Sequence, residues 1–156
     1  MNLGTIKING VEKKIDCTFA EEIVKENCKK ATVRGKEGLY FFYVESGGNN
    51  NSKYKIEGLT SSKLRGLLDL VNNIYSKVYY SNDKDLSRVL DDIAYLQVKY
   101  AYEAGREKTV KKFLDKSKLM LLIPHIIQKN DKKFFFDYCK YFEAYVAYMK
   151  YYGMED

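Results

Sequence analysis

The residues best suited to chemistry in this sequence are basic side chains interleaved with tyrosines. Steps of four and three place six residues along one face of a helix: Arg88, Asp92, Tyr95, Lys99, Tyr102 and Arg106. Lys and Arg neutralise phosphates and release counterions, while a tyrosine ring can stack on a base. The segment 106–118 continues the theme with six basic and two acidic residues. The pattern favours a nucleic-acid backbone as ligand, and a solvated helix face is an equal alternative on charge alone.

Catalysis has one titratable candidate, because His125 is the only histidine. Histidine is the usual general acid or base, but His125 follows Pro124 in an apolar stretch, where a partly buried structural histidine is the commoner case. Helical ribonucleases that pair an Arg with a His would need Arg at 118–120, where this chain has Lys, Leu and Met. The sequence contains no Gly-rich phosphate loop and no Cys/His cluster. We therefore predict that the protein is not an enzyme, with no catalytic residue, metal site or cofactor.

The composition describes a folded domain with a basic surface. The chain has 156 residues, of which 46% are hydrophobic and 31% charged, and its formal net charge is +6. These values exclude a disordered chain. The longest uninterrupted apolar run, at 119–123, is far shorter than the roughly 20 residues of a membrane span. The cysteines, Cys17, Cys28 and Cys139, show no disulfide or zinc spacing. We expect a cytoplasmic protein with reduced thiols and no membrane contact.

The elements that must position the basic stripe are helices, because apolar residues recur every three or four positions after residue 59. Thr60 and its serine neighbours can cap a first helix that runs to residue 78. A second helix would end at Gly105 in a left-handed cap, and a third would be ended or kinked by Pro124. A last helix would start at Asn130-Asp131 and end at Gly153. These four segments predict an all-α fold, an antiparallel bundle of four to five helices in a domain at 59–156.

Residues 1–58 differ in kind and are predicted to form an N-terminal extension or decoration. Asn9-Gly10 between alternating runs predicts a small β-hairpin over 5–15. A short helix could follow at 19–30 with Thr18 as its cap. Residues 39–44 could form a strand or a buried extended segment, and 46–52 are a loop by composition.

Tyrosines in the last helix exceed what one core face can hold. Tyr138, Phe142 and Tyr145 recur at helical spacing and are more often core than a stacking platform. The excess of aromatic residues towards the end of the helix is typical of a protein interface. We therefore expect this helix to serve both the core and a subunit contact, through Tyr145, Tyr148, Tyr151 and Tyr152.

Three motifs resemble one known family, the small subunit of the type III-A CRISPR effector, the Csm complex. The run KYFEAYVAYMKYYG at 140–153 is similar to the C-terminal signature of that family. The motif LTSSKLR at 59–65 resembles the opening of its first bundle helix, and QVKYAYEAGR at 97–106 resembles its central helix and turn. The motifs occur in the family's order and span residues 59–153. Met149 stands where many members have a His, in a packing or interface position.

The resemblance implies an all-helical, non-catalytic, RNA-binding subunit of an antiviral ribonucleoprotein. Copies of it would stack beside the backbone subunits that carry the guide RNA and would line the groove for target RNA, while the backbone subunits cleave the target. Sequence-independent contacts with the RNA backbone are expected from the basic residues of the motifs and their neighbours: Lys63, Arg65, Lys99 and Arg106 first, then Lys111, Lys112 and Lys140. This interpretation requires the first four to lie in a single trough.

Two other functions stay open at this point. The first is a helical protein–protein interaction module that uses the Tyr-rich last helix and binds no nucleic acid. The second is a small helical nuclease that depends on His125. The expected partners of the favoured interpretation are guide RNA, target RNA, the other effector subunits and further copies of the chain, and the isolated protein could form a homodimer through the aromatic helix.

Overall fold

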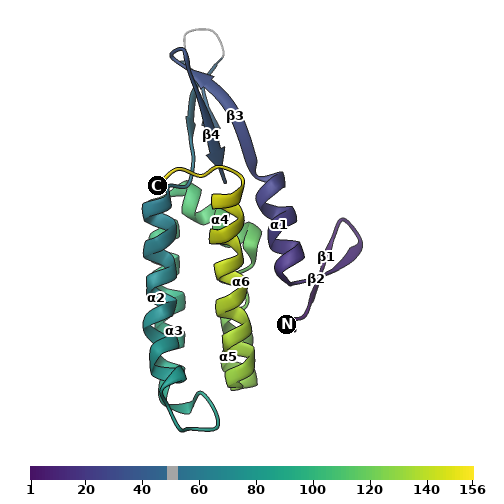
Figure 1. Cartoon of the computed structure of the whole chain (residues 1–156), viewed down its shortest axis with the longest axis vertical. Coiled ribbons are helices and arrows are strands. Elements are labelled where there is room, and N and C mark those ends of the chain that lie inside the picture. Colours follow the sequence, from purple (N-terminus) through teal and green to yellow (C-terminus); the bar gives the residue numbers. More distant parts are fainter. Residues whose placement is uncertain (49–52) are drawn as a thin grey trace.

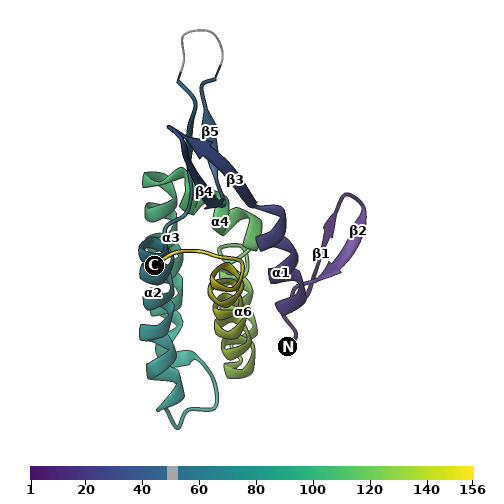
Figure 2. The same ribbon diagram turned by 45° about the horizontal axis from the view of Figure 1, so that its top comes forward.

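The computed structural model describes residues 1–48 and 53–156 and shows a helical body from which β-hairpins project (Figure 1, Figure 2). The helices are α1 (Cys17–Glu26), α2 (Ser61–Tyr79), α3 (Leu90–Arg106), α4 (Lys108–Ser117), α5 (Ile123–Lys129) and α6 (Lys132–Tyr151), with a 3-10 turn at Ser87–Val89. The strands are β1 (Thr5–Ile8), β2 (Val11–Lys14), β3 (Cys28–Val33), β4 (Lys36–Phe41), β5 (Val44–Ser46) and β6 (Lys55–Glu57).

The fold is mixed α/β, so the prediction of an all-α bundle of four to five helices is wrong. Among the described residues, six α-helices accompany three two-stranded antiparallel sheets, β1–β2, β3–β4 and β5–β6. The hairpin at Asn9-Gly10 is confirmed, with φ of 50° and 79° at the turn. Arg34-Gly35 forms a second turn of this kind with φ of 52° and 77°. Left-handed pairs suit tight hairpins, but Arg seldom occupies that conformation, so the sequence showed no comparable signal there.

Helix α1 joins the N-terminal hairpins to the helical body. Its N-cap is Asp16, whose carboxylate accepts a hydrogen bond from the Phe19 amide at 2.9 Å, and not Thr18 as predicted. The buried face of α1 packs against α6. Side chains from both sides of Gly58 therefore contribute to one hydrophobic core. The predicted loop at 46–52 falls partly outside the described residues, and its first residue ends β5.

The two long helices begin and end where the sequence predicted. The Thr60 hydroxyl accepts a hydrogen bond from the Lys63 amide and caps α2. Asp131 caps α6 through the Lys133 amide at 3.0 Å. Gly153, with φ of 112°, follows the end of α6. These caps are local interactions, which explains why they can be read from short stretches of sequence.

The third predicted helix is broken in two, and two predicted helix ends are wrong. Lys118 ends α4 in a left-handed conformation with φ of 67°. Pro124 lies in the first turn of α5, where its missing N–H leaves no hydrogen bond unmade. Gly105 lies inside α3 and does not end it; the chain leaves the helix at Glu107, which is extended. Pro124 therefore starts a helix, because tertiary contacts turn the chain before that residue.

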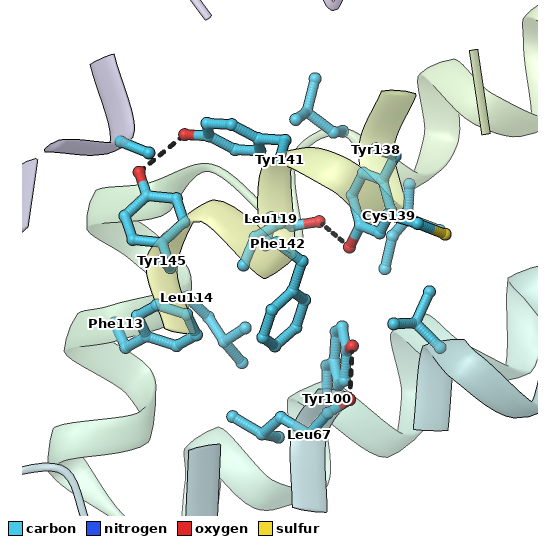
Figure 3. Close-up of a cluster of buried hydrophobic side chains, with 14 of the residues drawn as sticks. Leu67, Tyr100, Phe113, Leu114, Leu119, Tyr138, Cys139, Tyr141, Phe142 and Tyr145 are labelled. Carbon is cyan, nitrogen blue, oxygen red and sulfur yellow. Dashed lines mark hydrogen bonds between the residues drawn. The ribbon is translucent and has the colours of Figure 1, made fainter. Parts of the chain in front are cut away.

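Those tertiary contacts come from tyrosines of α6, which satisfy the backbone where α4 ends. Tyr141 donates its hydroxyl to the Ser117 carbonyl at 2.6 Å, and Tyr138 donates to the Leu119 carbonyl at 2.7 Å. Tyr100 of α3 likewise donates to the Leu67 carbonyl of α2 at 2.9 Å. Figure 3 shows these rings among buried apolar side chains. The last turn of a helix leaves carbonyls without partners, so buried phenols allow the break to occur inside the core.

Candidate nucleic-acid interface

The exposed face of α3 carries the basic and aromatic stripe that the sequence predicted. Tyr95 and Tyr102 are 58% and 64% exposed because the opposite face of the helix buries Ile93, Leu96 and Tyr100. The Lys99 ammonium lies 5.0 Å from the centre of the Tyr95 ring. The Arg106 guanidinium lies 5.5 Å from the centre of the Tyr102 ring. The outer face of α3 therefore presents two ring–cation pairs one after the other along the helix.

A shallow groove lies between this stripe and α2. It consists of two adjoining hollows of about 240 and 320 Å³, both of which are lined by Leu70 and Glu103. Lys63 lines the first hollow, and Lys99 lines the second together with Tyr95 and Tyr102. We call this surface the α2–α3 face and define it by Lys63, Leu70, Tyr95, Val98, Lys99, Tyr102, Glu103 and Arg106.

Two carboxylates position two of the cations on the α2–α3 face. Lys63 forms an ion pair with Glu107, whose pKa is lowered by the hydrogen bond and charge of the ammonium group. Arg106 lies 3.5 Å from the carboxylate of Glu103 on the previous turn. Lys99 has no carboxylate partner among residues 1–48 and 53–156. The face therefore combines one unpaired ammonium with two cations that are already held in place.

Arg65 does not lie on this face, so the prediction of a single trough for all four leading cations is wrong. It pairs with Asp156 at 3.0 Å, and Lys150 of α6 binds the same carboxylate at 3.0 Å. Two positions along a helix rotate a side chain by about 200°, so Lys63 and Arg65 leave α2 in nearly opposite directions. Sequence proximity placed them together, and helix geometry separates them.

The remaining predicted basic residues lie at three further places. Lys111 pairs with Asp115 on the same helix at 3.7 Å. Lys112 donates to the Tyr43 carbonyl at 2.7 Å and lies 4.2 Å from the Tyr43 ring centre, and partial burial lowers the pKa of its ammonium. Lys140 is exposed on α6, with its charge close enough to α1 to act on Cys17. Lys112 thus acts as a structural link between α4 and the strand region, which the sequence did not indicate.

The four tyrosines of the last helix that were predicted to form a subunit contact also lie in different environments. Tyr145 is fully buried in the core and offers no surface to a partner, so its prediction as an interface residue is wrong. Tyr152 is half-buried and donates to Glu21 of α1 at 3.1 Å. Tyr148 is half-buried against the core, while Tyr151 is 78% exposed. Only Tyr151 of this group presents most of its ring to solvent.

The comparisons with known proteins agree with the motifs that cover α2, α3 and α6. A family model described as Csm2 Type III-A matches residues 43–155. The protein "CRISPR system Cms protein Csm2" of Enterococcus italicus is 46% identical over 143 residues, which cover 91% of this chain and 92% of the relative.

The chain belongs to the Csm2 family of type III-A CRISPR systems.

More distant Csm2 relatives match less of the chain. The Csm2 protein of Streptococcus thermophilus is 35% identical over 98 residues, 63% of this chain and 76% of the relative. That of Mycobacterium tuberculosis is 35% identical over 99 residues, 63% of this chain and 78% of the relative. Membership of the Csm2 family makes the chain a small subunit of the type III-A Csm effector complex, with the other subunits of that complex as partners.

The matched region begins after β4, so the Csm2 model excludes the first two hairpins and α1. The relative from Enterococcus italicus covers 91% of the chain, and its match therefore includes most of that segment. Most of the segment before residue 43 therefore has a counterpart in one Csm2 relative, although it lies outside the part that the family model describes.

The described residues offer little support for a catalytic histidine, a metal site or a membrane span. His125 is exposed in the first turn of α5, not partly buried, and makes no side-chain hydrogen bond within the described residues. No group of three or more His, Cys, Asp or Glu residues in residues 1–48 and 53–156 could hold a metal ion. Across the same residues, no helix combines the length and apolar character that crossing a membrane requires.

Proposed function

We propose that this Csm2 protein binds RNA through its α2–α3 face and performs no catalysis. The observation that carries the proposal is the convergence of Lys63, Lys99 and Arg106 with two exposed tyrosine rings on one face. Cations supply affinity for phosphates without regard to sequence. Rings beside them add stacking that tolerates any base.

Within the effector complex, this face would line the groove that holds guide RNA and target RNA. Lys99 and Arg106 would contact phosphates, because each projects over a ring of the same helix and is held away from the core. Base pairing between guide and target would then supply the sequence specificity, while the protein contributes backbone contacts. The expected neighbours are the backbone subunits and further copies of this chain.

The test is RNA binding by the purified full-length chain, measured as fluorescence anisotropy of a labelled, unstructured RNA between about 50 and 200 mM salt. The variant K99E/R106E should bind about tenfold or more weakly than wild type, with a smaller salt dependence. The matched control is K14E/K84E, which reverses two exposed lysines that have no ion pair among the described residues. Equal affinity of K99E/R106E and the control, at equal thermal stability, would contradict the proposal.

A protein–protein interaction module is the second candidate, favoured by the exposed ring of Tyr151 at the end of α6. In that case the wild-type chain would show no salt-dependent RNA binding, and Tyr151→Ala would weaken association with other subunits or a homodimer measured by light scattering.

The third possibility, a nuclease, makes a different prediction from both. It requires RNA cleavage by the purified chain that disappears in His125→Ala. We expect wild type and His125→Ala to leave a labelled RNA equally intact.

A further inference from the structure

A second groove lies outside the α2–α3 face, between the tip of β3 and strand β6. It has a volume of about 600 Å³ and is lined by Thr32, Val33, Arg34, Lys53, Tyr54, Lys55, Ile56 and Glu57. We call it the β-arm groove. Its β3 wall precedes residue 43 and so lies outside the region that the Csm2 family model matches. In Figure 2 the strands of this region project beyond the helical body.

The charge of the β-arm groove is positive. Arg34, Lys53 and Lys55 line it together with one carboxylate, Glu57. None of the three cations forms an ion pair with another residue in the described parts of the chain. The four residues that precede Lys53 in the sequence are three asparagines and a serine, which carry no charge. The groove therefore has a net excess of positive charge that the chain itself does not neutralise.

The acidic residue of β5, Glu45, already binds two side chains outside the three cations of the groove. Glu45 accepts a hydrogen bond from Tyr54 at 2.6 Å and pairs with Lys29 at 2.9 Å. These two interactions lower the pKa of the Glu45 carboxyl group. Because Glu45 is engaged by Tyr54 and Lys29, it does not pair with Arg34 or Lys55, and it fixes the Tyr54 ring at the wall of the groove.

The position of the β-arm groove is held relative to the helical body. Phe42 is fully buried, and its ring packs edge-on against Phe113 of α4 with centres 5.1 Å apart. Lys112 of α4 donates to the Tyr43 carbonyl just before β5. An isolated two-stranded sheet is only marginally stable in water. These anchors therefore give a projecting pair of hairpins a defined place beside α4 and its lysines.

We propose that the β-arm groove is a second contact site for single-stranded RNA, separate from the α2–α3 face. Alternation along an extended chain places Lys53 and Lys55 on one side at about 6–7 Å, so both can reach phosphates of one strand. Tyr54 and Ile56 leave the opposite side of the same extended chain and, together with Val33, supply an apolar wall of the groove against which an unstacked base of that strand packs. An acidic peptide would use the cations but gain less from this wall, which is why RNA is the occupant that we infer.

The experiment is salt-dependent anisotropy of the same labelled RNA with the full-length variant R34E/K55E. It should bind several-fold more weakly than the control K14E/K84E, and its salt slope should fall by roughly 0.7 for each lost phosphate contact. Circular dichroism of both variants verifies that α1 to α6 remain folded. Affinity and slope equal to those of the control would overturn the proposal.

The two pairs of variants test the β-arm groove and the α2–α3 face separately. The inference rests on the proposed function only in taking RNA as the ligand. A loss in R34E/K55E with none in K99E/R106E supports the β-arm groove and overturns the α2–α3 face. The reverse result overturns the β-arm groove alone. A labelled polyglutamate peptide is the second probe: if R34E/K55E weakens its binding but leaves RNA binding unchanged, the groove is a site for acidic protein segments and the RNA proposal is wrong.

Discussion

The buried tyrosines of α6 and the exposed tyrosines of α3 have opposite roles. On α6, Tyr138, Tyr141 and Tyr145 are fully buried, and their hydroxyl groups bind backbone carbonyls or one another. On α3, Tyr95 and Tyr102 are exposed and lie against cations of the same helix. A buried phenol needs a partner for its hydroxyl and fixes the structure around that partner. An exposed phenol keeps its ring available for a ligand.

The comparison shows that residue type alone does not assign a tyrosine to core or surface. Tyr141 donates to the Ser117 carbonyl, so its one proton is used, and Tyr145 must donate to the Tyr141 oxygen. This chain of hydrogen bonds links α6 to the end of α4. No side-chain hydrogen bond within residues 1–48 and 53–156 holds Tyr95 or Tyr102 of α3. Changes at these two rings should therefore affect binding, whereas changes at the buried tyrosines of α6 should affect folding.

The largest expected effect is a loss of folding stability at high pH, caused by the buried tyrosines. Burial raises the pKa of Tyr100, Tyr138, Tyr141 and Tyr145 above that of a free phenol, so the native state keeps protons that the unfolded chain releases. The contribution of these phenols to stability is therefore constant below about pH 10 and falls above it, by up to about 1.4 kcal/mol per pH unit for each phenol. The four together give a loss of roughly 5 kcal/mol per unit.

The measurement is urea unfolding between pH 9 and 12, with phenolate absorbance recorded in parallel. Phenolate absorbance from the four buried rings should appear only as the chain unfolds. Complete ionisation of all 15 tyrosines while the native circular dichroism persists would contradict the assignment of the buried group.

Truncation of one buried ring should be the most damaging single substitution. Tyr138→Ala removes a fully buried ring and leaves the Leu119 carbonyl without its donor, so the free energy of unfolding should fall by about 3–5 kcal/mol. Tyr80→Ala, at a ring that is 82% exposed, is the matched control and should change it by less than about 0.5 kcal/mol. Similar urea midpoints for the two variants would show that the α6 rings are not the core.

Removal of a single hydroxyl should have a smaller effect of the same kind. Tyr141→Phe keeps the ring but deprives the Ser117 carbonyl and the Tyr145 hydroxyl of their partner, which should cost about 1–3 kcal/mol. Tyr148→Phe on the same helix is the control, because the Tyr148 hydroxyl makes no hydrogen bond within the described residues. Urea unfolding at pH 7 distinguishes the two variants. Equal stability would contradict the claim that these hydrogen bonds stabilise the junction of α4 and α6.

Substitution of the exposed rings should change stability least and binding most. Tyr95→Ala combined with Tyr102→Ala should leave the free energy of unfolding within about 0.5 kcal/mol of wild type. RNA affinity should fall about tenfold, since stacking contributes about 1–3 kcal/mol per base. The control is Tyr79→Ala with Tyr80→Ala, a second exposed pair, at the end of α2. Equal RNA affinity in both double variants would mean that the α3 rings do not stack on bases.

The success of sequence reasoning varied with the range of the interactions involved. The boundaries of α2 and α6 were predictable because Thr60, Asp131 and Gly153 act on backbone within three or four residues. The exposed stripe on α3 was predictable for the same reason, since a helical period places every fourth or third residue on one face. The break between α4 and α5 was not predictable, because its carbonyls are satisfied by α6, more than 18 residues further along the chain.

The sequence by itself determined the bounds of α2 and α6, the Asn9-Gly10 hairpin, the tyrosine and cation stripe of α3 and the Csm2 resemblance, because each depends on neighbours a few positions apart. Only the tertiary structure decided that Arg65 lies away from Lys63 and Lys99, that Tyr145 is buried, and that Arg34 and Lys55 share a groove. These outcomes depend on which elements pack together, and packing joins residues whose separation along the chain leaves no local pattern.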